Sequence, residues 1–146
     1  RGKDGLPKEV PLFRLAVNHG KKPDGASYGY VVQPLGKGAI PARIVANSTK
    51  LQAVATPDGE CIQAVFFSEE KVLSVSGLRL RVSSPSALML LRRNGKAVFA
   101  VADLAQDPNR KEVIVETSIP GAERIRIPLP GKPNCGKTAQ SNLRLP

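Results

Sequence analysis

The chain has 146 residues, of which 41% are hydrophobic, and a formal net charge of +10 at pH 7. This length is typical of one domain with a hydrophobic core or of two small β units, and no apolar run approaches the roughly 20 residues that a membrane span requires. The positive charge is concentrated in residues 1–50, which hold nine Lys or Arg residues against three acidic ones. Such a surface attracts anions and predicts an acidic ligand or neighbour, although a generally basic soluble surface explains the same excess.

The chain begins with RGKDGLPKEVPLF, which carries charges but no apolar stretch behind them. Neither a signal peptide nor an initiator Met is visible in it. We therefore expect the chain to be a piece of a longer protein, produced either by natural processing or by truncation.

Short runs rich in Val, Ile, Leu and Phe follow one another along the chain, separated by Pro and Gly. Residues 11–20 and 26–34 are predicted to form two strands joined by the turn KKPDG, and residues 51–67 two strands around a Pro-Asp-Gly turn. Between these pairs, GKGAIPARIVANS is the one helix candidate, a short turn interrupted by Pro41.

The second half of the chain continues the strand pattern. In KVLSVSGLRLRVSSP the apolar and basic residues alternate and are expected to face opposite ways, Leu78, Leu80 and Val82 against Arg79 and Arg81. Residues 87–104 predict a hairpin, because two apolar runs flank Asn94-Gly95, a pair typical of type I′ turns. Residues 112–118 and 124–129 predict two more strands. About nine or ten short strands without an amphipathic helix predict an all-β protein, an antiparallel β-sandwich.

Residues 131–138, GKPNCGKT, match the pattern G-x-x-x-x-G-K-T of a phosphate-binding P-loop. A P-loop requires a helix that begins at the Lys-Thr pair and points its N-terminus at the phosphates. The eight residues after Thr138 are too few for such a helix, and Pro133 removes an amide that would face phosphate. We therefore expect no nucleotide binding and interpret residues 131–146 as a flexible basic tail.

His19 lies in the segment VNHGKKPDGASYGY with Asn18, Tyr28 and Tyr30, residue types that suit proton transfer and carboxylate binding. Adjacent strand residues point to opposite faces, so Asn18 and His19 are not expected to line one pocket. His19 shares its predicted face with apolar residues and precedes Gly20, which favours a structural role. We interpret Tyr28 and Tyr30 as core or interface aromatics, and no catalytic residue is assigned.

The composition predicts neither a metal site nor a cofactor. The two cysteines, Cys61 and Cys135, are far apart in sequence, and the acidic residues never have the spacing of a calcium loop. The cysteines are either a disulfide, in an oxidising compartment, or two unrelated thiols. Asn47 begins a glycosylation sequon, which matters only in a eukaryotic secretory pathway.

The stretch FRLAVNHGKKPDGASYGYVVQP resembles the polysaccharide lyases of family 8, which include hyaluronan, chondroitin, xanthan and some alginate lyases. The resemblance is carried by His19-Gly20, by Pro23 in the turn, and by Tyr28-Gly29-Tyr30-Val31-Val32-Gln33-Pro34. Downstream, IVANSTKLQAV (44–54) and the segment 78–108 are similar to later parts of the same family, in the same order. A proline of the family pattern is displaced here, since Leu104 follows Asp103.

The resemblance implies part of a larger enzyme, in which an α/α toroid precedes a large central β-sandwich and a small C-terminal one. Residues 1–50 are then the terminal strands of the large sandwich and residues 51–130 the small sandwich, while the tail 131–146 lies outside the resemblance. The family cleaves acidic polysaccharides by β-elimination at a uronic acid. Its catalytic Asn, Tyr and His belong to the toroid and its junction with the β region, and none is matched by a residue of this chain.

We therefore predict a non-catalytic part of a secreted or periplasmic lyase that braces the catalytic domain and shapes one wall of the substrate cleft. Its partners would be that catalytic domain and an acidic polysaccharide, with no nucleic acid, nucleotide or membrane. Arg14, Lys21 and Lys22 are the candidate contacts to ligand or catalytic domain, with solvated charge as the ordinary alternative. The sequence leaves open which polysaccharide is cut and whether the action is endo or exo.

Two other functions compete with this prediction. A stand-alone carbohydrate-binding module for anionic glycans would bind without a partner, but such modules usually present an aromatic platform, and this chain is 4% aromatic with no Trp. A nucleic-acid binder would fit the pI of about 10.1, but the few aromatic residues leave little for base stacking.

Overall fold

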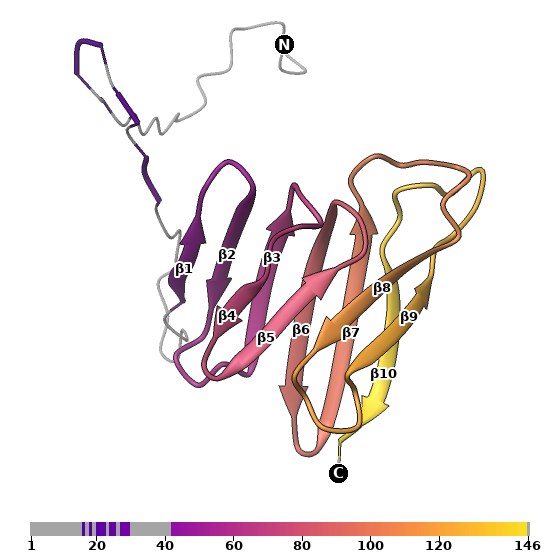
Figure 1. Ribbon diagram of the computed structural model, residues 1–146. Helices are drawn as coiled ribbons and strands as arrows, with labels where there is room; N and C mark the ends of the chain where they lie inside the picture. Colours follow the sequence, from indigo (N-terminus) through magenta and orange to yellow (C-terminus); the bar gives the residue numbers. More distant parts are fainter. Residues whose placement is uncertain are drawn as a thin grey trace, which may run out of the picture. The chain divides into compact units, whose positions relative to one another are not determined.

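The computed structural model describes residues 16, 18, 20–22, 24–25, 27–29 and 42–145. The chain divides into two compact units, residues 1–30 and 31–146. In the described part of the second unit, ten strands form two antiparallel sheets (Figure 1). The described residues contain no helix, and so none that could span a membrane. The predicted all-β sandwich is therefore confirmed.

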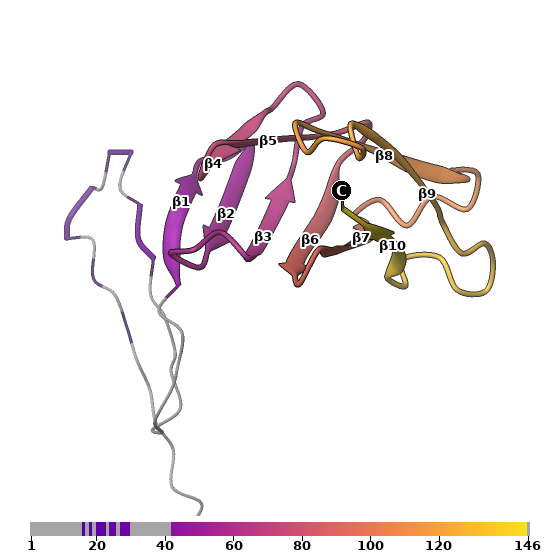
Figure 2. The same cartoon turned by 90° about the horizontal axis from the view of Figure 1, so that it is seen from below.

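The larger sheet has six strands in the order β1-β2-β3-β6-β7-β10. Its strands are β1 Arg43–Asn47, β2 Leu51–Ala55, β3 Cys61–Phe66, β6 Ser86–Arg93, β7 Lys96–Asp103 and β10 Ala139–Arg144. The smaller sheet has four strands in the order β4-β5-β8-β9. Its strands are β4 Leu73–Val75, β5 Leu78–Val82, β8 Glu112–Thr117 and β9 Arg124–Pro128. Figure 2 shows the two sheets as facing layers.

The hydrophobic core lies between the sheets and follows from the period-two alternation of their strands. In β5 the leucines at 78 and 80 point inward while the arginines at 79 and 81 are exposed, as the sequence predicts. Large side chains from both layers are completely buried, and each contributes about 1.5 to 3 kcal/mol to the free energy of folding. The fully buried large side chains include Phe66, Phe99, Leu80, Leu90, Val113 and Ile127.

The central hairpin, β6–β7, has the turn that its sequence predicts. Asn94 and Gly95 have positive φ values of 51° and 67°, as a type I′ turn requires. The strands pair in register from Arg93 opposite Lys96 to Ser86 opposite Asp103. The predicted strand pair in residues 51–67 is also present as β2 and β3. Residues 71–85, for which only the alternation was predicted, contain the hairpin β4–β5.

Two segments differ from the predictions. The helix candidate around Pro41 was wrong in its described part, because residues 43–47 form β1 and pair with β2. The tail was not expected to be ordered, but residues 139–144 form β10, which pairs with residues 96–101 of β7. Pairing with β7 satisfies the backbone groups that the two strands direct at each other, and Leu143 and Ala139 pack against the core.

The expected boundary after residue 50 does not coincide with a break in the structure, because β1 and β2 are neighbours in one sheet. The predicted strands 11–20 and 26–34 lie almost entirely outside the described residues. Their assignment to a large central sandwich therefore stays a prediction.

Candidate functional site

The site residues predicted from the sequence fall in the first unit, and Arg14, His19 and Tyr30 lie outside the described residues. Gly20 has a φ of 78° and donates its N–H to Asn18 Oδ1 at 2.8 Å, which makes a tight turn. The structure therefore joins Asn18 to Gly20.

The described lysines of this turn, Lys21 and Lys22, are exposed. Tyr28 is 58% exposed and is not a core residue of the described chain, which corrects the core alternative for this tyrosine. An interface role for Tyr28, and ligand contacts for the two lysines, stay predictions.

The P-loop-like segment is a pair of turns that leads into a strand. The N–H of Asn134 donates to the carbonyl of Gly131 at 2.8 Å, and the N–H of Lys137 donates to the carbonyl of Asn134 at 3.1 Å. β10 then begins at Ala139, where a P-loop would have a helix. The segment therefore lacks the helix N-terminus that phosphate binding in this motif depends on.

Gly136 in this segment should be intolerant of a side chain. Its φ is 83°, and a Cβ built there would lie 2.7 Å from Gln106 Cγ. We expect Gly136→Ala to lower the free energy of unfolding by about 1 to 3 kcal/mol, because it adds both backbone strain and a steric clash. Gly131→Ala is the matched control, since nothing lies within 4 Å of its built Cβ. Urea unfolding of both variants tests this, and equal midpoints would contradict it.

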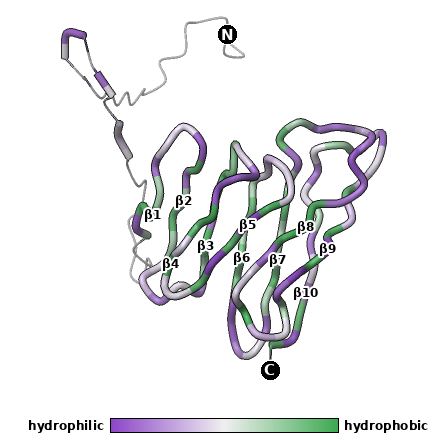
Figure 3. Tube along the Cα trace, viewed as in Figure 1, coloured by the Kyte–Doolittle hydropathy of each residue, from purple (hydrophilic) through white to green (hydrophobic). Residues whose placement is uncertain are grey.

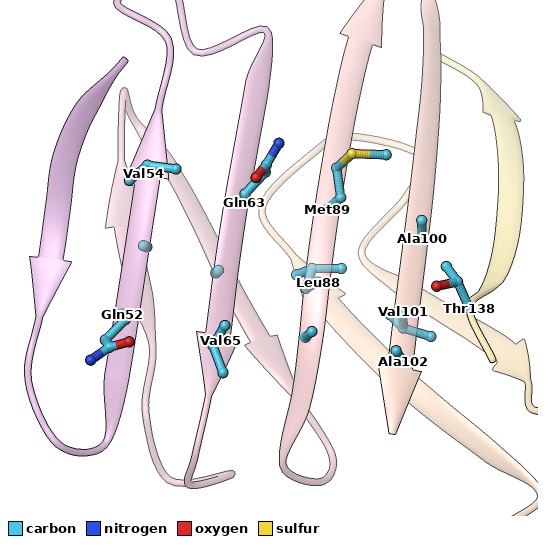
Figure 4. A pocket seen from close by; sticks show the side chains of 13 residues that line it. Gln52, Val54, Gln63, Val65, Leu88, Met89, Ala100, Val101, Ala102 and Thr138 are labelled. Carbon is cyan, nitrogen blue, oxygen red and sulfur yellow. The ribbon is translucent and has the colours of Figure 1, made fainter. Parts of the chain in front are cut away.

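The outer face of the six-stranded sheet is apolar in its centre. We call the central part of this surface the apolar face. It consists of outward side chains of β2, β3, β6 and β7 and of Thr138 beside them: Gln52, Val54, Gln63, Val65, Ala87, Met89, Ala100, Ala102 and Thr138. They line a shallow hollow of about 480 Å³, and none of them carries a charge (Figure 4). Met89 and the adjacent outward Leu91 are 36% and 41% exposed.

A row of three positive charges borders the apolar face at one end. Arg93, Lys96 and Arg144 sit directly opposite one another on β6, β7 and β10. All three are exposed, and none of them forms an ion pair with another described residue. Like charges directly across neighbouring strands are destabilising. We call these three residues the basic row.

The outer face of the four-stranded sheet is charged instead (Figure 3). Glu116 on β8 lies 3.9 Å from Arg81 on β5 and 3.3 Å from Arg124 on β9. Arg126 pairs with Glu112 on the same face. These side chains are about half exposed, so each pair contributes less than about 1 kcal/mol. This face has the pattern of a sheet surface in contact with water.

The loop after β7 is organised by Asp103, whose side chain is only 2% exposed. Its two oxygens accept the N–H groups of Ala105 at 3.2 Å and Asp107 at 2.9 Å. The guanidinium of Arg110 donates to the same carboxylate. One buried acid therefore fixes the connection that carries the chain from the larger sheet to the smaller one.

The β2–β3 turn lowers the pKa of one of its own carboxyl groups, that of Asp58. The hydroxyl of Thr56 donates to Asp58 Oδ1 at 2.5 Å and the N–H of Glu60 donates at 2.9 Å. These bonds, the one from Thr56 first, lower the pKa of Asp58, and the charge of Arg92 acts in the same direction. Arg92 also donates to the carbonyl of Gly59 at 2.9 Å, which ties the turn to β6.

We expect Thr56→Ala to raise the pKa of Asp58 toward its ordinary value, because the largest cause of the lowering is removed. With a lowered folded pKa, Asp58 contributes stability above its unfolded pKa, and that contribution is lost as pH falls through the folded value. An NMR titration of the Asp58 carboxyl in both proteins measures the difference. An unchanged midpoint would contradict the assignment.

The described residues contain no group of three or more His, Cys, Asp or Glu side chains that could hold a metal ion. Cys61 and Cys135 are free thiols, and each is half-buried. Of the two alternatives left open by the sequence, the structure therefore has the two unpaired thiols and not the disulfide. Asn47, in the glycosylation sequon, is exposed at the end of β1.

Comparison with known proteins identifies the sandwich. A family model described as "Polysaccharide lyase family 8, C-terminal beta-sandwich domain" matches residues 43–112, which run from β1 to the start of β8. Residues 43–112 are a family 8 C-terminal domain. The family 8 resemblance seen in the sequence is therefore confirmed.

A curated relative of the family 8 domain is chondroitinase-AC of Pedobacter heparinus. It is 31% identical over an alignment of 139 positions, and the match covers 88% of this chain and 20% of the relative. The chain thus spans about a fifth of the length of this relative.

Two solved structures have the same fold. One is a structure of chondroitinase AC lyase, from work on its active site with enzyme–oligosaccharide complexes. The match has a TM-score of 0.60 and 27% identity, and it covers 70% of this chain and 15% of that one. The other is the Streptomyces coelicolor A3 chondroitin AC lyase in complex with chondroitin sulphate. It has a TM-score of 0.55 at 19% identity, covers 72% of this chain and 15% of that one, and shows the fold alone.

Sequence reasoning missed the apolar face and the Asp103 anchor. A signal for the first was present, because ALMLL (87–91) and AVFAVA (97–102) are unbroken apolar runs where a half-solvated strand would alternate. For the Asp103 anchor, the signal is an acidic residue directly after the apolar run of β7. Its partner Arg110 can be identified only from the folded loop.

Proposed function

We propose that this chain is the C-terminal, non-catalytic β-sandwich part of a family 8 polysaccharide lyase that cleaves uronic-acid-containing polysaccharides by β-elimination. The match to chondroitinase-AC over 88% of the chain carries the proposal. It is supported by the family model on residues 43–112 and by the similar fold in a chondroitinase AC lyase structure. A secreted or periplasmic location is part of the same proposal.

In this proposal the sandwich braces the catalytic domain and shapes one wall of the substrate cleft. A two-layer sandwich with a continuous core is a rigid support for such a role. The net charge of +10 suits a polyanionic substrate, whose approach a positive surface would favour. Arg14, Lys21 and Lys22 are the proposed contacts to substrate or catalytic domain.

β-Elimination requires a base that removes the proton beside the uronate carboxylate and groups that stabilise the resulting negative charge. In the described residues, the charged side chains with short contacts serve structure: Asp103 orders a loop, and the arginines of the smaller sheet pair with Glu112 and Glu116. We therefore place the chemistry in the part of the enzyme outside this domain.

The test is a β-elimination assay on chondroitin, hyaluronan and alginate, with the unsaturated uronate product followed by its ultraviolet absorbance. The complete polypeptide that contains this sequence should cleave at least one of these polymers, and the 146-residue chain alone should cleave none. Cleavage by the chain alone would contradict the non-catalytic role. A complete polypeptide inactive on all three would contradict the assignment to a uronate lyase.

The alternative is a stand-alone module that binds anionic glycans, for which the arginines on the smaller sheet are the supporting observation. The isolated chain would then bind immobilised chondroitin sulphate by itself, and DNA would compete poorly. Because DNA and uronate polymers both give salt-dependent binding, the competition and not the salt slope separates a glycan module from a nucleic-acid binder.

A further inference from the structure

We infer that the apolar face is a docking surface for the part of the lyase polypeptide that lies outside this domain, an inference that rests on the proposed function. The partner surface would present large apolar side chains to the hollow and carboxylates to the basic row.

The two sheets of the sandwich differ in the residues on their outer faces. In LRLRV of β5 and in RIRI of β9, every second residue is an arginine, as expected for a sheet with one face in water. In β6 and β7, the runs ALMLL and AVFAVA are apolar on both sides of the strand. Near-continuous apolar runs are typical of strands covered on both faces. The inner side of β6 and β7 faces the core, so their outer side requires a second cover.

The shape of the apolar face indicates what that cover must be. The small side chains of Ala87, Ala100 and Ala102 form the floor of the hollow, and the larger Val54, Val65 and Met89 stand beside it. Such a floor accepts protruding aliphatic or aromatic side chains at close-packing distance. Gln52 and Gln63 add amide groups that can hydrogen-bond to the cover.

The basic row adds charge to the recognition. Three cations aligned across β6, β7 and β10 repel one another, and no described residue neutralises them through an ion pair. Carboxylates on a docked partner would remove this repulsion. The face therefore selects a surface that is apolar opposite the hollow and acidic opposite the basic row.

The occupant is assigned to the rest of the same enzyme, because the chain matches only 20% of chondroitinase-AC and 15% of a solved chondroitinase AC lyase. Most of such an enzyme is therefore available to cover this sheet. A second copy of the chain fits less well, since it would oppose one hollow with another, and its own apolar face carries no acid to meet the basic row.

The experiment uses a single engineered thiol in the complete polypeptide, with Cys61 and Cys135 replaced by Ser. Gln63→Cys places the thiol in the apolar face, and Ser74→Cys places one on the outer face of the smaller sheet; both positions are exposed in the domain. We expect maleimide to label the Ser74→Cys protein readily and the Gln63→Cys protein at least tenfold more slowly. In the isolated 146-residue chain the two thiols should react at similar rates.

A charge variant gives a second readout. Met89→Glu should lower the melting temperature of the complete polypeptide while leaving that of the isolated chain almost unchanged. Ile114→Glu is the matched control, because residue 114 points outward from a central strand of the other sheet and lies opposite Arg126. Ile114→Glu should change neither protein strongly.

Equal labelling of Gln63→Cys and Ser74→Cys in the complete polypeptide would overturn the docking surface. Protection of Gln63→Cys in the isolated chain, with a dimer in sedimentation, would overturn it in favour of a second copy. The lyase assay on the same preparations separates the two proposals. An active enzyme with equal labelling of the two thiols would contradict only the docking surface. An inactive protein with a protected Gln63→Cys thiol would contradict only the lyase assignment.

Discussion

Replacing Asp103 with Ala is expected to lower the free energy of unfolding by about 3 to 4 kcal/mol. The Asp103 side chain is 2% exposed and accepts two backbone N–H groups and the Arg110 guanidinium. The substitution leaves all three donors without their acceptor, and Arg110 is itself only 26% exposed. The loop that joins the two sheets would then lose its anchor.

Two variants make the measurement specific. Asp103→Asn keeps the shape and one acceptor oxygen, so it should cost less than Asp103→Ala while still weakening the contact with Arg110. Glu116→Ala removes an acid from ion pairs with Arg81 and Arg124 that are about half exposed, and should cost less than about 1 kcal/mol. Urea unfolding followed by circular dichroism gives the three values. An Asp103→Ala cost as small as that of Glu116→Ala would contradict the anchoring role.

Phe99→Ala should cost about 3 to 5 kcal/mol. Phe99 is 0% exposed, lies in the middle of β7, and sits between Leu90 on β6 and Ser141 on β10. Removing its ring leaves a cavity in the centre of the core that neighbouring strands can fill only in part, because they are held in register by the sheet.

Phe67→Ala is the matched control for this core prediction. Phe67 is 47% exposed just after β3, and its backbone N–H bonds to Lys50 in either variant. Its removal should cost about 1 kcal/mol or less. Comparable losses for the two phenylalanines in urea unfolding would mean that the core does not lie between the sheets as described.

The sequence predicted the elements whose conformation follows from local residue preferences. Asn94-Gly95 favours a type I′ turn through backbone conformations that these two residues adopt readily, and the Leu–Arg alternation in β5 assigns each side chain to a face. These are local properties, so short-range reasoning finds them.

The two edge strands of the six-stranded sheet, β1 and β10, were missed for a physical reason. β10, with the sequence AQSNLR, has no β-branched residue and only weak alternation, and it is held by pairing with β7. β1 follows a proline-containing segment and is held by β2 in the same way. Their conformation depends on pairing with the neighbouring strand of the sheet, so propensity alone does not predict them.

The site was predictable only in part. The basic composition and the family resemblance point to an acidic polysaccharide, but the apolar face requires knowing which side of β6 and β7 faces the core. Predicting the basic row requires the register of β6 against β7 and the register of β10 against β7. The second pairing joins strands that are far apart in the sequence. Tertiary pairing, which the sequence does not state, therefore decides both features.

The most direct test of the bracing role is the β-elimination rate of the complete polypeptide carrying Asp103→Ala, measured across the temperatures at which this domain unfolds. We expect the rate to fall together with the unfolding of the domain, and a Phe67→Ala enzyme to keep the wild-type rate over the same range. An Asp103→Ala enzyme that retains the wild-type rate after its C-terminal sandwich has unfolded would contradict the bracing role.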